Sequence, residues 1–514
     1  MSSASENAEF SFTGDESLIG FEPFSIELPL SITPAQLRKD LPQLNDPQVQ
    51  LPEQLLFLLH GEFLDPSKPI FDVIQKMDLS TETSLNIEIV VPSFEPPRET
   101  KSFPHDDAVM AVCQIYDKWI ITGCLDGTFR IWNRAGDQLL QHRAHEYPIT
   151  ALEAVPSDSK KDTEFSLICG SKDSTVSVWA VKLITHIKEE PIETPSKKKK
   201  RSVPSNVEES SVTEIVTLTA HSQSVSALSV DKMNTVCATG GWDGCLFIYP
   251  LQHLLNHSNS TNPEKKRSKR EGQADDSEED NDHSTVPTPA VSLRGHRGAI
   301  TGVLFEPGGH FVWTGGMDHR LIKWSISEKK PVLEMHAPNS ILSLTGHFTS
   351  TSSFLTTSHV DGSCRLWTPM NAQKRTHRPY KHCLVGYATS VMWMPDSETH
   401  FLCVGHDGRV SVWDYRSHIP LHRRKVQPKK DEEEESGEYV MSANSKQLKM
   451  PEDAWTMDNY LYEREEEQSP TKILCGCTMR YRQERGRESV LLCCGCDDGT
   501  LRTFVMNTSL LKSE

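Results

Sequence analysis

Long hydrophobic runs are missing from this 514-residue sequence, which contains no stretch of about 18 uncharged apolar residues of the kind that spans a bilayer. The N-terminal segment MSSASENAEF also lacks the basic and then apolar pattern of a secretory signal peptide. Both absences argue against a membrane or secreted protein. We therefore expect a cytosolic or nuclear chain with no membrane partner.

Catalytic motifs are absent as well. The sequence has no Gly-x-Ser-x-Gly elbow, no P-loop and no His-Glu-x-x-His pair, and it shows no isolated carboxylate pair outside the repeat described below. We expect a protein that is not an enzyme, with no catalytic residue and no cofactor.

Zinc knuckles are missing although the chain has 13 cysteines. The densest group has C-x-C and CC-x-C spacing on two predicted strands: Cys475, Cys477, Cys493, Cys494 and Cys496. Zinc sites of this type usually place C-x₂-C pairs on turns, so the spacing disfavours a metal site. Most other cysteines stand singly in apolar, strand-like runs, which predicts buried thiols.

One motif recurs seven times after about residue 105: an Asp, usually a Gly, a run that alternates apolar and polar residues, and an aromatic residue six positions after the Asp. Asp-Gly suits a tight hairpin turn, and the alternation suits a strand with one buried face. The instances are Asp126 to Trp132, Asp173 to Trp179, Asp243 to Tyr249, Asp318 to Trp324, Asp361 to Trp367, Asp407 to Trp413 and Asp498 to Phe504.

This pattern resembles the WD-repeat family, in which each repeat of about 40 to 45 residues forms one four-stranded blade. The resemblance implies a mainly β chain with a seven-bladed β-propeller over residues 105–510. In the family, an upstream His, a Ser or Thr, the Asp and the Trp form a buried hydrogen-bonded chain that locks each blade. It implies this structural role for the seven aspartates, the five tryptophans and five upstream histidines, which are His105, His145, His221, His296 and His336.

Three repeats depart from that pattern. Cys169, Cys403 and Cys494 stand where the other repeats have Thr, and the last two repeats lack a clear upstream His. We expect packing to hold these three blades more than hydrogen bonds do, and their aspartates to be more exposed.

Residues 8–92 lack the repeat and show strands at 10–12, 24–28, 55–64 and 84–91, with a helix that opens at Thr33-Pro34 and a second, short helix before the last strand. This order resembles a ubiquitin-like β-grasp domain of the NLE type. Residues 93–104 are expected to be a Pro-rich linker and a closing strand, because the last repeat ends one outer strand short and PRETKSFP is the only well-placed donor.

Long intervals between repeats predict insertions at about 184–212, 254–289 and 420–468, all of biased composition. The first two carry dense basic runs: Lys197, Lys198, Lys199, Lys200 and Arg201, then Lys265, Lys266, Arg267, Lys269 and Arg270. These runs are typical of nuclear-import signals, while contact with nucleic acid or a merely solvated loop remain alternatives. The net charge of −17 argues against a broad nucleic-acid-binding surface.

A ubiquitin-like domain followed directly by a WD-repeat propeller resembles the ribosome biogenesis proteins with an NLE-type domain. The segments FPHDDAVMAV and LSTETSLNIE are most similar to the WD-repeat subunits of the pescadillo complex, with notchless as second choice. The resemblance implies a scaffold and assembly factor for the large (60S) ribosomal subunit and for pre-rRNA maturation, located in nucleus, nucleolus and nucleoplasm. The implied partners are the block-of-proliferation WD-repeat protein, pescadillo, the pre-60S particle and, through the ubiquitin-like domain, the AAA-type ATPase midasin.

Another class of binding protein remains open, namely a substrate receptor or adaptor for a nuclear ubiquitin ligase. Propellers often bind degradation signals, although no F-box or similar adaptor helix precedes this one.

The same resemblance implies a role for Glu82. An acidic residue at this place in the family completes the coordination sphere of a Mg²⁺ ion held by midasin, and Mg²⁺ prefers such oxygen ligands. The alternative is that Glu82 is merely solvated, as exposed glutamates before strands usually are.

Overall fold

The computed structural model describes residues 7–14, 23–44, 55–59, 62–64, 68–77, 79, 84–90, 97–157, 161–184, 210–255, 287–349, 353–368, 377–380, 384, 386–395, 397–416, 422–425, 471–482 and 488–507. Most of these residues lie in strands. Glu82, both basic runs and most of the three expected insertions lie outside the described residues. In the described part of the chain, no helix is both long enough and apolar enough to cross a bilayer.

The N-terminal part forms a five-stranded sheet in the order β2-β1-β5-β3-β4, in which only β1 and β5 run parallel. Its elements are β1 (Asn7–Gly14), β2 (Phe24–Pro29), α1 (Pro34–Leu44), β3 (Leu56–Leu59), β4 (Glu62–Phe63), α2 (Ile70–Met77) and β5 (Leu85–Val90). One core lies between this sheet and the two helices, with Phe10, Phe12, Leu37 and Ile87 fully buried.

Helix α1 begins where the sequence predicts it. Thr33 is the N-cap, because its hydroxyl accepts a hydrogen bond from the Gln36 backbone N–H at 3.3 Å. The Gln36 side chain accepts one in return from the Thr33 N–H at 3.1 Å. This reciprocal pair satisfies two backbone donors at the helix start, and Pro34 fits the first helical position because it has no N–H to satisfy there.

The rest of the described chain forms seven four-stranded antiparallel sheets. In chain order, the first holds β7 (Val109–Ile115), β8 (Trp119–Cys124), β9 (Thr128–Asn133) and β10 (Gln138–Arg143). The second holds β11 (Ile149–Pro156), β12 (Glu164–Ser171), β13 (Val176–Lys182) and β14 (Ser211–Leu218). The third holds β15 (Val225–Val230), β16 (Val236–Gly241), β17 (Cys245–Pro250) and β18 (Val291–Arg294), with α3 (Leu251–Leu255) after β17.

The fourth sheet holds β19 (Ile300–Phe305), β20 (Phe311–Gly316), β21 (Arg320–Ser325) and β22 (Lys330–His336). The fifth holds β23 (Ile341–Phe348), β24 (Ser353–His359), β25 (Cys364–Trp367) and β26 (His377–Tyr380). The sixth holds β27 (Ala388–Trp393), β28 (His400–Gly405), β29 (Arg409–Asp414) and β30 (His422–Lys425), and the seventh holds β31 (Ile473–Arg482), β32 (Glu488–Cys496), β33 (Thr500–Asn507) and β6 (Arg98–Pro104). β30 lies inside the expected third insertion, which therefore begins later than the composition suggests.

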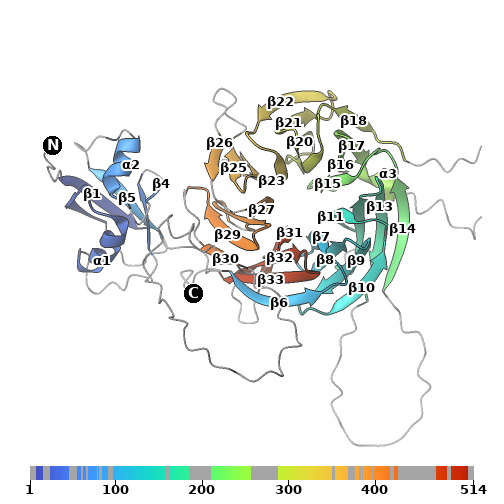
Figure 1. Ribbon diagram of the computed structural model, residues 1–514, viewed down its shortest axis with the longest axis horizontal. Coiled ribbons are helices and arrows are strands. Elements are labelled where there is room, and N and C mark those ends of the chain that lie inside the picture. Colours follow the sequence, from blue (N-terminus) through green and yellow to red (C-terminus); the bar gives the residue numbers. More distant parts are fainter. Residues whose placement is uncertain are drawn as a thin grey trace, which may run out of the picture.

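The seven sheets stand around a common centre (Figure 1). The first strand of each sheet is innermost, and each innermost strand contacts the next, from β7 through β27 to β31 and back to β7. This arrangement is consistent with a β-propeller.

A β-bulge lies near the start of each innermost strand, and in several of them the hydroxyl of the bulged residue reaches the next sheet. The register shifts between Ile149 and Ala151, and the Thr150 hydroxyl there donates to the carbonyl of Val225 on the next innermost strand. Thr301 donates to Ile341 at 2.7 Å and Thr389 to Ile473 at 2.9 Å in the same way. Bulges commonly re-aim a side chain in this manner, and here they join neighbouring sheets.

The seventh sheet contains strands from both ends of this part of the chain: β6 precedes the first sheet, and β31 to β33 come last. β6 pairs antiparallel with β33, from Thr500 opposite Pro104 to Val505 opposite Arg98. Phe103 of β6 is buried and stacks on Trp132 of the first sheet, with 5.3 Å between ring centroids. The Cys475 thiol on β31 donates to the Val109 carbonyl on β7 at 3.5 Å. Strand pairing, ring stacking and a polar contact thus join the seventh sheet to the first.

We predict that Phe103→Ala lowers the free energy of unfolding by about 3–4 kcal/mol, because it removes a buried ring and leaves a cavity against Trp132. Urea denaturation of the full chain measures this change. Ser102→Ala, at an exposed position of the same strand, serves as the control and should leave stability nearly unchanged. Equal stability of the Phe103→Ala variant and the parent would show that β6 does not hold the ring together.

Candidate functional site

The seven repeat aspartates occupy equivalent places, each in the turn between the second and third strands of its sheet. The residue before the Asp donates its backbone N–H to the residue just before the innermost strand, as Leu125 does to Ala108 at 2.9 Å and Trp242 to Ser224 at 2.8 Å. These turns and the loops that enter the innermost strands therefore lie at one end of the sheets. We call this end the turn face.

Glycine follows the Asp in five of the seven turns, each with positive φ between 67° and 78°. Ser174 and His319 take the same left-handed conformation, with φ values of 74° and 67°. The turn imposes this conformation whatever the residue, although it is strained for side chains other than glycine. The structure thus explains why the motif reads "usually Gly".

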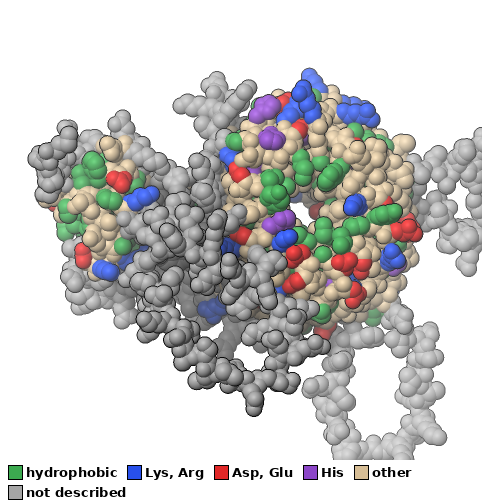
Figure 2. All heavy atoms as spheres, in the orientation of Figure 1, with side chains coloured by type: hydrophobic (Ala, Val, Ile, Leu, Met, Phe, Trp, Pro, Cys, Tyr) green, Lys and Arg blue, Asp and Glu red, His purple; other side chains and the backbone are tan. Residues whose placement is uncertain are grey.

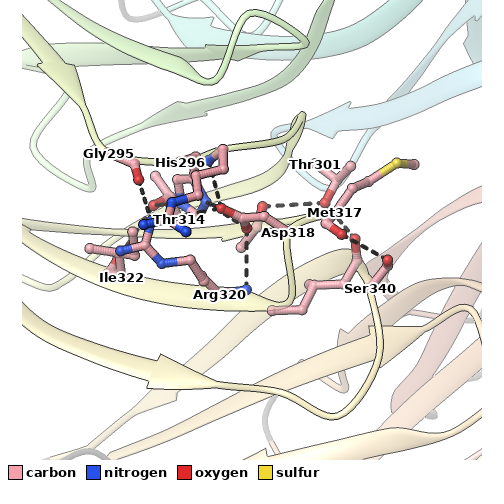
Figure 3. A network of polar contacts seen from close by, with 12 residues as sticks. Gly295, His296, Thr301, Thr314, Met317, Asp318, Arg320, Ile322 and Ser340 are labelled. Carbon is pink, nitrogen blue, oxygen red and sulfur yellow. Dashed lines mark hydrogen bonds and ion pairs between the residues drawn. The ribbon is translucent and has the colours of Figure 1, made fainter.

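The fourth sheet carries a complete polar network (Figure 3). His296 Nδ1 lies 2.9 Å from the Asp318 carboxylate, and its Nε2 lies 2.7 Å from the Thr314 hydroxyl. The Trp324 indole N–H donates to the same hydroxyl at 2.8 Å. The network joins the loop that enters β19, strand β20, the turn that holds Asp318 and strand β21. Each of the three inner strands of this sheet therefore belongs to the network or adjoins it.

Hydrogen bonds decide the charge state of this aspartate. Burial alone would raise the pKa of Asp318, but hydrogen bonds from His296 and from the Arg297 backbone N–H outweigh burial, so the pKa is lowered. The carboxylate is thus held ionised under the surface, which is tolerable only because its oxygens are satisfied.

The second and third sheets have related networks. His221 connects Asp243, at 3.1 Å, with Thr239, at 2.8 Å. In the second sheet Cys169 replaces the Thr, and Ser177 on the neighbouring strand takes over the role. Its hydroxyl lies 2.7 Å from His145 Nε2 and accepts the Trp179 N–H at 2.7 Å, while His145 Nδ1 lies 2.9 Å from Asp173.

The first, fifth and seventh sheets use an arginine four residues after the Asp in place of a His contact. Arg502 lies 2.8 Å from Asp498, Arg365 lies 3.2 Å from Asp361, and Arg130 lies 4.0 Å from Asp126. Arg130 also contacts Asp106. In the sixth sheet Arg409 lies 3.9 Å from Asp407, and the Trp413 N–H donates to Ser411 at 3.0 Å. Sequence reasoning missed these arginines, whose signal is the Arg in DGTFR, DGSCR and DGTLR.

Two expectations from the WD-repeat pattern, those for His336 and His105, are wrong. His336 lies exposed beside Glu334, and in the fifth sheet His359 contacts Thr357 at 2.8 Å while the Asn339 amide donates to Asp361. His105 contacts Thr122 at 2.8 Å but its second nitrogen faces the Phe103 carbonyl, not Asp126.

The aspartates of the Cys-bearing sheets are also not the more exposed ones. The Asp407 side chain is 10 % exposed, against 28 % for Asp126 and 34 % for Asp361, whose sheets have the Thr. The physical reason is that a neighbouring serine or an arginine replaces the missing hydroxyl or His, so the carboxylate stays near its partners.

We predict that Ser177→Ala costs about 1–3 kcal/mol of stability, because it leaves both His145 and the Trp179 N–H without their shared partner. Chemical denaturation measures the difference. Ser229→Ala, at a half-buried position on β15 outside these networks, is the matched control and should cost well under half as much. If the two variants are equally stable, the hydroxyl of Ser177 does not lock the second sheet.

Glu153 is an isolated carboxyl group among the innermost strands. It lies on β11, opposite Ile168 of β12, and burial raises its pKa from 4.5 to about 7. Its surroundings include thiols on neighbouring sheets, the half-buried Cys113 and the buried Cys237, because burial and then the charge of Glu153 raise the pKa values of both.

A raised pKa means that the folded state favours protonated Glu153, so this stabilisation is full below pH 4.5 and is lost as the pH rises through about 7. We predict that Glu153→Gln increases the free energy of unfolding by about 1–3 kcal/mol at pH 8 and by much less at pH 5. Urea denaturation at both pH values measures this. The control is Glu146→Gln at an exposed position, and a pH-independent effect of Glu153→Gln would contradict the prediction.

No metal-binding group is found among the described residues, where no three His, Cys, Asp or Glu side chains gather suitably. The described cysteines are free thiols and most are buried. Because burial raises the pKa of Cys475 and Cys494 well above the ordinary value, these thiols are poor metal ligands as they stand.

Comparison with known proteins finds a matching family and several relatives. The family "WD domain, G-beta repeat" matches residues 98–133, 136–180, 212–249, 287–325 and 328–368, which run from β6 to β25. The sixth sheet and strands β31 to β33 of the seventh, whose aspartates have no His contact, are not among the matched residues. These five segments of the chain therefore match WD repeats.

Within this class, curated relatives carry the name "Ribosome biogenesis protein WDR12 homolog". The protein from Culex quinquefasciatus is 26 % identical over 365 residues, which cover 70 % of this chain and 74 % of the relative. The Chlamydomonas reinhardtii protein is 24 % identical over 383 residues, covering 72 % and 79 %, and the Drosophila persimilis protein is 26 % identical over 361 residues, covering 70 % and 74 %. The resemblance drawn from the sequence is thereby confirmed.

Proposed function

We propose that the chain is a non-enzymatic scaffold in ribosome biogenesis, acting in assembly of the 60S subunit and in pre-rRNA maturation. In this proposal the seven sheets are the blades of one propeller, and the N-terminal sheet with α1 and α2 is a ubiquitin-like docking domain. The observation that carries the proposal is the similarity to relatives named for ribosome biogenesis over about 70 % of the chain.

The geometry supports a binding role. The repeat aspartates that catalysis could use are occupied by His, Arg, Ser or Thr partners, and they lie beneath the turns as structural groups. A ring of pinned turns offers a large rigid surface, and rigid surfaces lose little entropy when they bind.

The order β2-β1-β5-β3-β4, with β1 and β5 parallel and α1 between β2 and β3, supports the ubiquitin-like assignment. We infer that this domain contacts midasin, and that Glu82 donates its carboxylate to a Mg²⁺ ion bound by midasin. Block-of-proliferation protein and pescadillo are the proposed partners of the propeller on the pre-60S particle. The basic runs 197–201 and 265–270 would direct the chain to the nucleus, nucleolus and nucleoplasm.

Sedimentation of the tagged full chain from nuclear extract tests the proposal. We expect the parent chain to co-sediment with 60S precursors, and Glu82→Ala to accumulate on them because release by midasin fails. Glu88→Ala, on β5 of the same sheet, is the control and should distribute like the parent.

The outcomes separate the alternatives. Co-purification of cullin components instead of pre-60S proteins would favour the ubiquitin-ligase adaptor and overturn the proposal. A parent-like distribution of Glu82→Ala, together with unchanged Mg²⁺-dependent binding to midasin, would overturn only the role of Glu82.

A further inference from the structure

Two cysteines from neighbouring sheets meet in the interior of the ring. Cys364 lies on β25 of the fifth sheet and Cys403 on β28 of the sixth, and their Sγ atoms are 2.9 Å apart. Both side chains are fully buried. Carbon atoms in ordinary contact lie about 3.5–4.0 Å apart, and sulfur is larger than carbon. The two thiols are therefore closer than unbonded sulfur atoms usually come, and a disulfide of about 2.0 Å would need only a small further approach.

Both cysteines are exceptional at their places in the repeat. Cys403 stands four residues before its Asp, where four other repeats have Thr, and Cys364 stands three residues after its Asp, where the other six have Phe, Val or Leu. The equivalent places also meet between the first and second sheets, where Phe129 and Cys169 belong to one buried cluster. Only for the fifth and sixth sheets does the sequence put a thiol at both places.

Apolar side chains surround the pair. Leu366, Leu384 and Ala388 belong to the same buried cluster as the two thiols. Hydrophobic side chains also gather around the central opening of the ring on the face that Figure 2 shows. Charged molecules enter such surroundings at a high free-energy cost, whereas a small neutral molecule does not. Hydrogen peroxide is therefore a suitable oxidant for this pair, and the charged disulfide of glutathione is not.

A buried hydroxyl group lies on the same side of the fifth sheet. Ser358 on β24 stands directly opposite Cys364 on β25, and residues opposite each other in a sheet project on the same side. The Ser358 Oγ atom is buried and has no hydrogen-bond partner among the described residues. A buried hydroxyl costs stability until it finds a partner, and the oxygen of an oxidised sulfur would supply one.

We propose that Cys364 and Cys403 are a redox pair, which peroxide converts into a disulfide between the fifth and sixth sheets. The dithiol is the resting form wherever the cell keeps its thiols reduced. The disulfide joins two residues that are 39 positions apart in the chain, and such a bond restricts the unfolded state. The ring is thus harder to open between these two sheets under oxidising conditions.

The reaction takes two steps. One sulfur attacks a peroxide oxygen, so that an S–O bond forms, the O–O bond breaks, the peroxide accepts two electrons from the sulfur and water leaves. The other sulfur then attacks the resulting sulfenic acid: the S–S bond forms, the S–O bond breaks, and the hydroxyl group leaves as water with the proton of the second thiol. Two thiols and one hydrogen peroxide thus give one disulfide and two waters, and a dithiol reductant reverses the change by exchange.

Burial controls the rate of this reaction. The thiolate attacks peroxide far better than the thiol does, and an apolar interior disfavours the thiolate. Oxidation therefore depends on brief local opening of the contact between the two sheets. A low concentration of urea, which makes such opening more frequent, should accelerate it.

Peptide mapping of the full chain tests the inference. The reduced chain is treated with hydrogen peroxide, its remaining thiols are alkylated, and it is digested without reductant for mass spectrometry. We expect a cross-linked peptide that contains Cys364 and Cys403, a loss of two thiols per chain, and reversal by dithiothreitol. Oxidised glutathione at the same concentration should give much less of this cross-link. The urea midpoint should be higher for the oxidised chain than for the reduced one.

Two matched variants assign the pair. Cys403→Thr introduces the residue that four repeats carry at this place, so it should fold, give no such cross-link and show no shift of the urea midpoint on oxidation. Cys169→Thr makes the same change at the equivalent place of the second sheet and should keep both the cross-link and the shift. Circular dichroism of the reduced variants shows whether they are folded. Cys364→Leu, which introduces the residue of three other repeats, takes the place of Cys403→Thr if that variant unfolds.

Several results would overturn the inference. One is the absence of the cross-link both in buffer and in a low concentration of urea, with the chain folded. Another is a disulfide between Cys477 and Cys493, which lie opposite each other on β31 and β32, in place of the expected one. Cross-links between chains on a non-reducing gel, or a midpoint shift that persists in Cys403→Thr, would contradict it as well. Failure of the pre-60S experiment bears on the proposed function alone, because none of these measurements uses its partners.

Discussion

Contact between neighbouring innermost strands is the constraint on which the rest of this structure depends. A four-stranded sheet of this size cannot bury both faces by itself, so each sheet is stable only between two neighbours. The contact of β31 with β7 and the pairing of β6 with β33 give the first and seventh sheets two neighbours as well. The ring thereby has no end at which a hydrophobic face would be left open among its described strands.

The β-bulges explain why each sheet takes one position relative to its neighbour. A hydrophobic interface between two sheets tolerates small shifts, because burial is not directional. A hydroxyl that reaches the backbone of the next strand, as Thr301 reaches Ile341 and Thr389 reaches Ile473, fixes one register. Packing therefore holds the ring together, and these bonds set the position of each sheet relative to the next.

Much of the fold could be predicted from the sequence. The helix start at Thr33 follows from the local chemistry of two side chains, and the third strand of every sheet begins after its predicted turn because the Asp and the alternation are local signals. The partners of each Asp were predicted less well. Ser177 replaces Cys169 from the neighbouring strand, and in the fifth sheet His359, not the expected His336, contacts the Thr357 hydroxyl. These replacements depend on which side chains two strands bring together, and that geometry is not contained in spacing along the chain.

Arginine and histidine both contact the repeat aspartate, but they differ in the other residues that they contact. His296 links its Asp to Thr314 and Trp324, so the turn is tied to the inside of its sheet. Arg502 contacts Asp498 at 2.8 Å and Glu99 of β6 at 3.4 Å, so the same group ties the turn to the strand from the other end of the ring. Arg130 similarly joins Asp126 to Asp106 in the entering loop.

The groups that lie beneath the turn face therefore differ from sheet to sheet. In the third and fourth sheets the histidines hydrogen-bond the aspartates beneath the surface, and the exposed residues above them include Trp242 and Met317. In the first and seventh sheets the buried arginines lie between two carboxylates, Arg130 between Asp126 and Asp106 and Arg502 between Asp498 and Glu99. The histidines thus tie a turn to its own sheet, whereas Arg130 and Arg502 bring a second carboxylate to it.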